Sequence, residues 1–220
     1  MDNIDWGYFD SWMARADYPT NGIFDPRTLR PVGELADRVV EIARTAPAMI
    51  EGGETFLDIG SNKGFWCFHL RWVYDRLVGY EPVEEFHRFS RELQRAHGIE
   101  DVEFILGGAS DIPDETRFTC VYLGHVNHHL FNREVLEGRE PFDHMRKFAA
   151  LAIDTLVMDG PVTLEDPTAR ALSEFWSEDR RRMFTPENYI ESVAKDFELV
   201  GRGPSGTTFK RSILCFRRKK

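Results

Sequence analysis

The chain has 220 residues, a formal net charge of −9 and a pI of about 5.3. Its 42% hydrophobic and 30% charged residues are typical of one soluble globular domain. The acidic balance argues against broad, non-specific nucleic-acid binding, which needs a basic face. The first thirty residues lack the basic segment and following apolar run of a signal peptide. No apolar stretch approaches the ~20 residues that cross a bilayer, so we expect a cytoplasmic protein without membrane contact.

Residues 1–32 form an aromatic segment interrupted by prolines, which we expect to be an N-terminal arm. A short helix is predicted over 6–14. Such an arm can close as a lid over a small-molecule site, or it can simply pack against the domain, and the sequence leaves both alternatives open. Its aromatic residues are Trp6, Tyr8, Phe9, Trp12, Tyr18 and Phe24.

Strands and helices alternate through the domain expected over 33–220. Apolar residues at helical spacing predict a helix over 33–46, and the β-branched and apolar run 55–59 predicts a buried strand. The next helix, 64–74, should be buried on several sides, because apolar residues from Phe65 to Val73, Trp72 included, cover most of its circumference. Further strands are predicted at 77–80, 102–106, 118–123 and 153–158, and further helices at 83–97 and 141–150.

The end of the chain has a different pattern. Thr185 as N-cap, Pro186 at the first helical position and Glu187 in the first turn predict a helix that runs to about Phe197. Two strand-like runs, 198–202 and 209–216, then flank a Gly-Pro-Ser-Gly turn. They predict an antiparallel hairpin at a sheet edge.

These elements predict an α/β fold: a doubly wound, mostly parallel seven-stranded sheet with helices on both faces and a C-terminal antiparallel hairpin. Ligands in such sheets bind at the carboxyl ends of the strands, near the switch in strand order. The candidate segments are therefore 58–64, 81–82, 107–110, 123–129 and 159–161.

The turn after strand 55–59 reads Asp58-x-Gly60-x-x-x-Gly64. Glycines there let the backbone approach a ligand, and the following helix presents free N–H groups. The pattern is neither the dinucleotide fingerprint nor a phosphate loop. It resembles motif I of the class I S-adenosylmethionine-dependent methyltransferases, and the order of elements from about residue 33 to 218 is similar to that of the same family.

The resemblance implies S-adenosyl-L-methionine as the cofactor and assigns its binding residues. Asp58, Gly60 and Gly64 would hold the methionine end, with added contacts from Ser61 and Asn62. Lys63, in the same loop, either faces solvent or pairs with a carboxylate. Glu81, followed by Pro82, stands where the family has an acid that accepts hydrogen bonds from both ribose hydroxyls.

The adenine end departs from the family pattern. The family often has Gly-Asp-Ala after the third strand, whereas this chain has Gly107-Gly108-Ala109-Ser110-Asp111, so Gly108 takes the place of the acid. Adenine recognition would then rest on backbone groups of Gly108 and Ala109, or on Ser110 or Asp111.

Residues 119–130 align with a family pattern that ends in Leu-His-His-Leu. Leu123, Gly124 and His125 should lie at the end of the fourth strand, close to the transferable methyl group. His125, His128 and His129 are candidate general bases, because histidine titrates near neutral pH. A metal site is not expected, since no second ligand cluster accompanies them, and a structural role is the alternative for each.

No disulfide framework or metal spacing is expected from the three cysteines. Cys120 and Cys215 lie in apolar strand-like runs, where cysteine acts as a small hydrophobe. The long insertion 160–184 should help select the methyl acceptor. Its arginines, in the run 178–182, either receive an anionic group or pair with acids on an exposed helix.

Three functions follow as hypotheses. The first is methyl transfer to an oxygen or nitrogen of a small molecule, such as a sugar or secondary metabolite of natural-product biosynthesis. The second is an RNA methyltransferase that uses Lys210, Arg211 and the basic tail 217–220 as a local phosphate-binding surface. The third is a non-catalytic cofactor-binding or scaffold protein. The oligomeric state stays open, with a homodimer among the alternatives.

Overall fold

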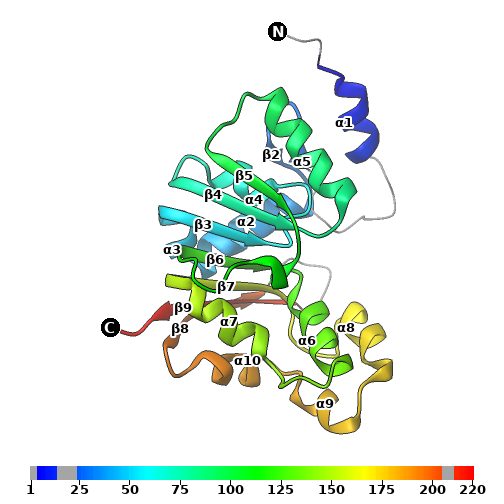
Figure 1. Cartoon of the computed structure of the whole chain (residues 1–220), viewed down its shortest axis with the longest axis vertical. Helices are drawn as coiled ribbons and strands as arrows, with labels where there is room; N and C mark the ends of the chain where they lie inside the picture. The colour runs from blue at the N-terminus through cyan, green and yellow to red at the C-terminus, as the bar shows by residue number, and fades with distance from the viewer. Residues whose placement is uncertain (1–3, 14–23, 205–210) are drawn as a thin grey trace.

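A seven-stranded sheet in the order β5-β4-β3-β6-β7-β9-β8 forms the centre of the protein (Figure 1). The computed structural model describes residues 4–13, 24–204 and 211–220. The first five strands of this order are parallel, and β9 is antiparallel to both β7 and β8. The strands are β3 (Gly53–Ile59), β4 (Tyr74–Glu81), β5 (Val102–Leu106), β6 (Phe118–Gly124), β7 (Ala152–Pro161), β8 (Phe197–Pro204) and β9 (Arg211–Arg218). The predicted α/β class and terminal hairpin are confirmed.

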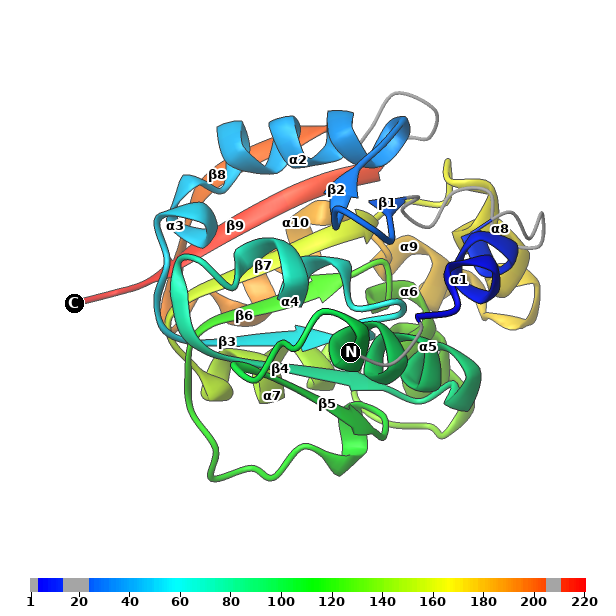
Figure 2. The ribbon, with the colours of Figure 1, turned by 90° about the horizontal axis from the view of Figure 1, so that it is seen from above.

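Helices cover both faces of the sheet (Figure 2). One layer holds α2 (Glu34–Thr45), α3 (Pro47–Glu51), α4 (Phe65–Leu70) and α5 (Glu84–Ala96), whose buried side chains share one core cluster. The other layer holds α6 (Asn127–Leu136), α7 (Asp143–Leu151) and α10 (Pro186–Val193), which share a second cluster. The strand β3 contributes side chains to both clusters: Phe56 packs into the first and Leu57 into the second. A parallel strand buried on both faces therefore appears in the sequence as a continuous apolar run.

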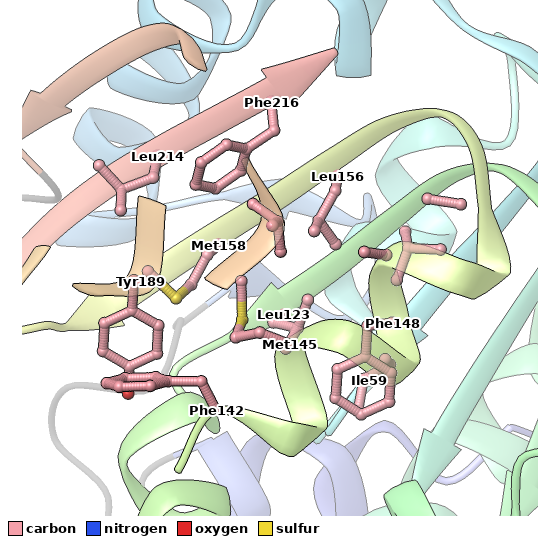
Figure 3. Close-up of a cluster of buried hydrophobic side chains, with 14 of the residues drawn as sticks. Ile59, Leu123, Phe142, Met145, Phe148, Leu156, Met158, Tyr189, Leu214 and Phe216 are labelled. Atoms are coloured by element: carbon pink, nitrogen blue, oxygen red, sulfur yellow. The ribbon is translucent and has the colours of Figure 1, made fainter. Parts of the chain in front are cut away.

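The second cluster shows how the sheet and the helices interlock (Figure 3). Leu123 of β6 and Met158 of β7 pack with Met145 and Phe148 of α7. Leu123 is completely buried there, so its side chain belongs to the core. This placement matters for the site, because Leu123 was one of the predicted cofactor contacts.

The predicted helix 64–74 ends early, at Leu70. The chain then turns, and β4 begins at Tyr74, three residues before the predicted strand. The N–H of Gly53 donates to the carbonyl of Val73 at 2.9 Å, which ties this turn to the start of β3. The predicted burial of Phe65 is confirmed, whereas that of Trp72 is wrong: its side chain is 79% exposed and Arg71 lies over its ring.

The insertion 160–184 is folded. It contains α8 (Pro167–Leu172), a 3-10 turn (Ser173–Phe175) and α9 (Glu178–Met183), and the sequence analysis offered a helix, as one alternative, only for the run that forms α9. Asp166 caps α8 by accepting hydrogen bonds from the N–H groups of Thr168 and Ala169. On α9, Arg182 pairs with Glu178 at 3.0 Å while both are exposed, which fits the alternative of an ion-paired exposed helix.

The described part of the N-terminal arm lies against the α5 layer. The helix α1 (Trp6–Met13) packs on α5 through Phe9 and Phe89, whose ring centroids are 5.4 Å apart. A short hairpin follows, of β1 (Phe24–Asp25) and β2 (Arg30–Pro31). Tyr18 lies outside the described residues. Across the parts of the chain that are described, no helix is both long and apolar enough to cross a membrane.

Candidate active site

A cavity of about 390 Å³ opens at the carboxyl ends of β3, β4 and β6. The strand order reverses between β3 and β6, which is the position where doubly wound sheets bind ligands. The wall includes residues 60–63 of the predicted loop, Glu81 and Pro82, Gly108 and Ala109, and Gly124 and His125. Gly64, Leu123 and His128 do not line it. The tertiary structure therefore brings together four strand ends that are distant in the sequence.

The loop after β3 needs its glycines for steric reasons. Gly60 and Gly64 have φ values of 74° and 80°, a region that favours glycine. A Cβ on Gly60 would lie 2.2 Å from Val126, and one on Gly64 would lie 2.5 Å from the ring of Phe104. The loop can thus pass close to the neighbouring elements and to a ligand in the cavity.

Two buried carboxyl groups face this cavity. Asp58 is 1% exposed, and its Oδ2 has no hydrogen-bond partner among the described residues. Burial raises the pKa of Asp58 to about 8; Glu81 raises it further, and Arg38 opposes the shift. Burial also raises the pKa of Glu81, whose two carboxylate oxygens accept hydrogen bonds from the N–H groups of Asn62 and Val83, at 2.7 and 2.8 Å. The site is thus prepared for a ligand that carries positive charge.

Two further loop residues lie on the wall. The Oγ of Ser61 is buried without a partner in the described chain, so this hydroxyl at the cavity wall is available for a hydrogen bond to a ligand. Lys63 is only 6% exposed and lines the cavity. The alternative that Lys63 faces solvent is therefore wrong.

At the expected adenine end, Gly108 and Ala109 line the cavity. Asp111 is exposed and accepts a hydrogen bond from the N–H of Gly108 at 2.7 Å. Ser110 is also exposed and lines a separate cavity of about 220 Å³. Of the four alternatives, the backbone at 108–109 is the one that faces the main cavity. The sequence analysis missed the apolar wall beside it, which includes Val83, Phe86 and Leu130.

His125 is held by hydrogen bonds at the end of β6. Its Nδ1 lies 2.7 Å from Nη1 of Arg211, and because arginine only donates, Nδ1 must be the acceptor. The proton of the neutral ring then sits on Nε2, which is buried 3.6 Å from Oδ1 of Asp159. Burial, aided by Arg38, lowers the pKa of His125 to about 4. In this arrangement neither nitrogen directs a lone pair at the cavity.

The other two histidines differ in placement. His128 is 3% exposed and lies behind the wall, and burial lowers its pKa to about 2. His129 lines the cavity with an exposed ring, and desolvation lowers its pKa. Their ring centroids are 4.1 Å apart. No group of three metal-ligating side chains occurs among the residues that the structure describes.

A polar network that the sequence did not suggest stands beside His125. Arg38 of α2 donates from Nε to Asp159 and from Nη2 to the hydroxyl of Tyr122, at 2.7 Å in the second case. The Tyr122 hydroxyl donates to the same Asp159 carboxylate at 2.9 Å. Of the three residues in this network, only Asp159 lies in a candidate segment of the sequence analysis, residues 159–161. The sequence shows Arg38 only as one of several charged residues on a predicted helix.

Arg211 extends the network to the insertion. Its Nε donates to Asp166, the cap of α8, at 3.0 Å, so hydrogen bonds lead from Asp166 through Arg211 to His125. The Arg211 side chain is 9% exposed and ion-paired. The suggestion that Arg211 belongs to an exposed phosphate-binding surface is therefore wrong. Lys210, its proposed companion, lies outside the described residues.

The comparisons with known proteins agree with this geometry. Residues 57–138 match the family described as "Methyltransferase domain". The chain is similar to the crystal structure of the N-methyltransferase NodS from Bradyrhizobium japonicum WM9 in complex with S-adenosyl-L-homocysteine: TM-score 0.64 and 11% identity, covering 99% of this chain and 100% of that one.

A second similar structure is the magnesium protoporphyrin IX methyltransferase ChlM from Synechocystis PCC 6803, with a TM-score of 0.62, 16% identity and coverage of 97% and 94%. A putative S-adenosylmethionine-dependent methyltransferase from Listeria monocytogenes has a TM-score of 0.61, 15% identity and coverage of 84% and 99%. At these identities the structural likeness concerns the fold. No curated protein matches the sequence. Residues 57–138 thus match a methyltransferase domain, and the chain as a whole has the fold of the class I S-adenosylmethionine-dependent methyltransferases.

Proposed function

We propose that the protein transfers a methyl group to an oxygen or nitrogen of a small molecule, such as a sugar or secondary metabolite. The observation that carries this proposal is that one cavity joins the glycine loop and Glu81 to a wall of aromatic rings from β1, α4 and β6. One end suits the cofactor, and the other leaves room for an acceptor. The names of NodS and ChlM, an N-methyltransferase and a magnesium protoporphyrin IX methyltransferase, support a small acceptor by analogy.

The residues on the cofactor side fit S-adenosylmethionine. Its ammonium and sulfonium groups are cations, and they would meet the buried Asp58 carboxyl, which has an oxygen without a partner in the described chain. Glu81, beside Pro82, would accept from the ribose hydroxyls with its remaining lone pairs. When bound, this cofactor supplies an activated methyl group. The loop contacts proposed for it are Gly60, Ser61 and Asn62, with Gly108 and Ala109 at the adenine and Gly124 near the methyl group. Gly64 would help through the positive φ that shapes the same loop.

The chain's own residues then position the acceptor and exclude water. Phe24, from the N-terminal arm, contributes to the wall and is 1% exposed, so we propose the arm 1–32 as part of the acceptor side. If an acceptor must lose a proton, His129 is the histidine whose exposed ring lies at the cavity. His125 would act as a neutral, fixed neighbour of the reacting group.

Titration calorimetry with S-adenosylhomocysteine tests the first requirement of the proposal, which is that the cavity binds the cofactor. Saturable binding that Glu81→Ala weakens supports the cofactor site. Absence of binding by the folded wild-type protein would remove both the enzymatic and the cofactor-scaffold hypotheses.

No observation favours RNA as the acceptor. The guanidinium of Arg218 donates to the carbonyls of Ala149 and Ala152 and lies over Phe197, and Arg217 pairs with Asp154. These two tail arginines are therefore engaged within the fold.

A further inference from the structure

One part of the cavity wall remains after the cofactor segments are assigned. It consists of Phe24, Leu35, Arg38, Phe65, Trp66 and Tyr122, and we name it the acceptor end. The inference below rests on the proposed function, because it assumes that the acceptor occupies this end. Its chemistry can be judged from the groups that the wall presents.

Most of the acceptor end is aromatic. Phe24, Phe65 and Trp66 are at most 6% exposed, and the rings of Phe24 and Phe65 have centroids 5.7 Å apart. The ring of Trp66 lies 5.4 Å from that of Tyr122. Flat, apolar surfaces of this kind favour a planar ring as the body of the ligand.

The polar groups still available at this end are donors. Arg38 uses Nε and Nη2 on Asp159 and Tyr122, whereas its Nη1 has no partner among the described residues, and its side chain is 12% exposed. The indole N–H of Trp66 likewise has no hydrogen-bond partner in the described chain. Hydrogen-bond donors without a partner in a nearly buried site favour a ligand whose oxygens can accept from them. Among such oxygen groups, a carboxylate suits the guanidinium of arginine.

A free base is missing from the described residues of the acceptor end. The Asp159 carboxylate behind it accepts from Arg38 and Tyr122. The Tyr122 hydroxyl is itself a donor in that network, and Nδ1 of His125 accepts from Arg211. A nucleophile at this end should therefore arrive without a proton to lose.

We propose that the methyl acceptor is a planar, aromatic carboxylate, held by Arg38 and Trp66, and that the product is its methyl ester. One carboxylate oxygen accepts from the Arg38 guanidinium, and the other attacks the methyl carbon. The new bond joins oxygen to carbon, while the carbon–sulfur bond breaks and leaves its electron pair on sulfur. A neutral ester and a neutral thioether result, and no proton is released.

The test is calorimetry on protein saturated with S-adenosylhomocysteine, with benzoate, benzamide and benzylamine as probes that share one ring. Benzoate should bind roughly tenfold or more tightly than the other two, because only it pairs with the guanidinium. Equal or tighter binding of benzylamine, or no binding of benzoate at millimolar concentration, overturns the proposal. Failure of S-adenosylhomocysteine itself to bind is a separate outcome that overturns the proposed function as well.

Variants assign the effect to named donors. Arg38→Met should weaken benzoate about tenfold or more, whereas Arg44→Met, on the exposed side of the same helix, should change it by less than about twofold. Because Arg38 also ties α2 to β7, Trp66→Phe is the second variant: it keeps the ring and removes the N–H. If benzoate affinity is unchanged in both Arg38→Met and Trp66→Phe, the proposal is wrong.

The carboxylate could instead come from the cofactor's own methionine end. In that case Arg38→Met weakens S-adenosylhomocysteine but not 5′-methylthioadenosine, which lacks the amino acid, and leaves benzoate unaffected. That result overturns the acceptor assignment.

A methyl-labelled cofactor tests the chemistry of the product. Label that mild alkali releases as methanol supports a methyl ester. Alkali-stable label, or no labelled product from an acid that binds, excludes the carboxylate as nucleophile.

Discussion

Arg211 donates a hydrogen bond from Nη1 to Nδ1 of His125 at 2.7 Å. Since a guanidinium has no acceptor, this contact selects the His125 tautomer with its proton on Nε2. It also links β9 to the end of β6, because Arg211 is held in turn by Asp166. The state of the histidine nearest the expected methyl group thus depends on a residue 86 positions away.

Replacing Arg211 with methionine should raise the pKa of His125 from about 4 and release its Nδ1, because both the cation and the donor are lost. Nitrogen-15 NMR of labelled histidine measures the tautomer and the titration directly. Arg217→Met, an exposed ion-paired position on the same strand, is the matched control. An unchanged His125 spectrum in Arg211→Met would show that the contact does not set the tautomer.

Cofactor affinity should depend on pH through Asp58. Its pKa of about 8 in the cofactor-free protein means that the group is largely neutral at pH 7, whereas a bound cation favours the carboxylate. Affinity for S-adenosylmethionine should therefore rise with pH up to about 8, with uptake of the cofactor releasing a proton at lower pH. Calorimetry in buffers of different ionisation enthalpy measures that proton, and Asp58→Asn should abolish it.

In the cofactor-free protein, the Asp58 carboxyl should make stability fall, not rise, as the pH increases. The pKa of Asp58 in the folded protein lies above its ordinary value of about 3.9, so folding disfavours the ionised form of Asp58. Its contribution should lower the free energy of unfolding as pH rises from about 4 to 8. Urea denaturation of wild type and Asp58→Asn measures the difference, which should increase over this interval in favour of the variant. A pH-independent difference would contradict the raised pKa.

Glu81→Gln should weaken S-adenosylhomocysteine binding about tenfold or more, because a carboxylate that accepts several hydrogen bonds is replaced by an amide with one acceptor oxygen. Equilibrium dialysis gives the affinity. Glu103→Gln, exposed on the neighbouring strand β5 and paired with Arg76, should leave it unchanged. Equal affinities in both variants would remove Glu81 from the ribose site.

Gly64→Ala should destabilise the protein more than Gly98→Ala. Both glycines have positive φ, so each alanine pays a backbone penalty of about 1–2 kcal/mol. At Gly98 nothing lies within 4 Å of the added methyl group, whereas at Gly64 it meets the Phe104 ring at 2.5 Å. Chemical denaturation compares the two, and equal losses would mean that the ring moves aside without cost.

His125→Ala should lower turnover far more than cofactor affinity. The ring lines the cavity at the end of β6 and is held at Nδ1 by Arg211, so its loss should disturb the reacting geometry while the glycine loop and Glu81 stay intact. Steady-state kinetics with a methyl acceptor and calorimetry with S-adenosylhomocysteine separate the two effects. A matched loss in both would place His125 in the cofactor site instead.

Local rules explain what was predictable. Strand β3 is a continuous apolar run because parallel strands are buried on both faces, and the Thr185-Pro186-Glu187 start of α10 follows from capping chemistry. Trp72 was misplaced because helical periodicity continues through a turn that is set by pairing between Gly53 and Val73. The helix α8 of the insertion was missed, although Asp166-Pro167 is a start signal of the same kind as Thr185-Pro186.

The amino-acid sequence by itself determined the alternation of strands and helices and the acid-and-glycine loop of residues 58–64, because periodicity, capping and positive φ are properties of neighbouring residues. Only the tertiary structure decided which charges meet. Arg38 and Asp159 are 121 residues apart, and Asp166 is 45 residues from Arg211. A long charged side chain has many potential partners, and the packing of α2, β7, β9 and the insertion around one cavity selects among them.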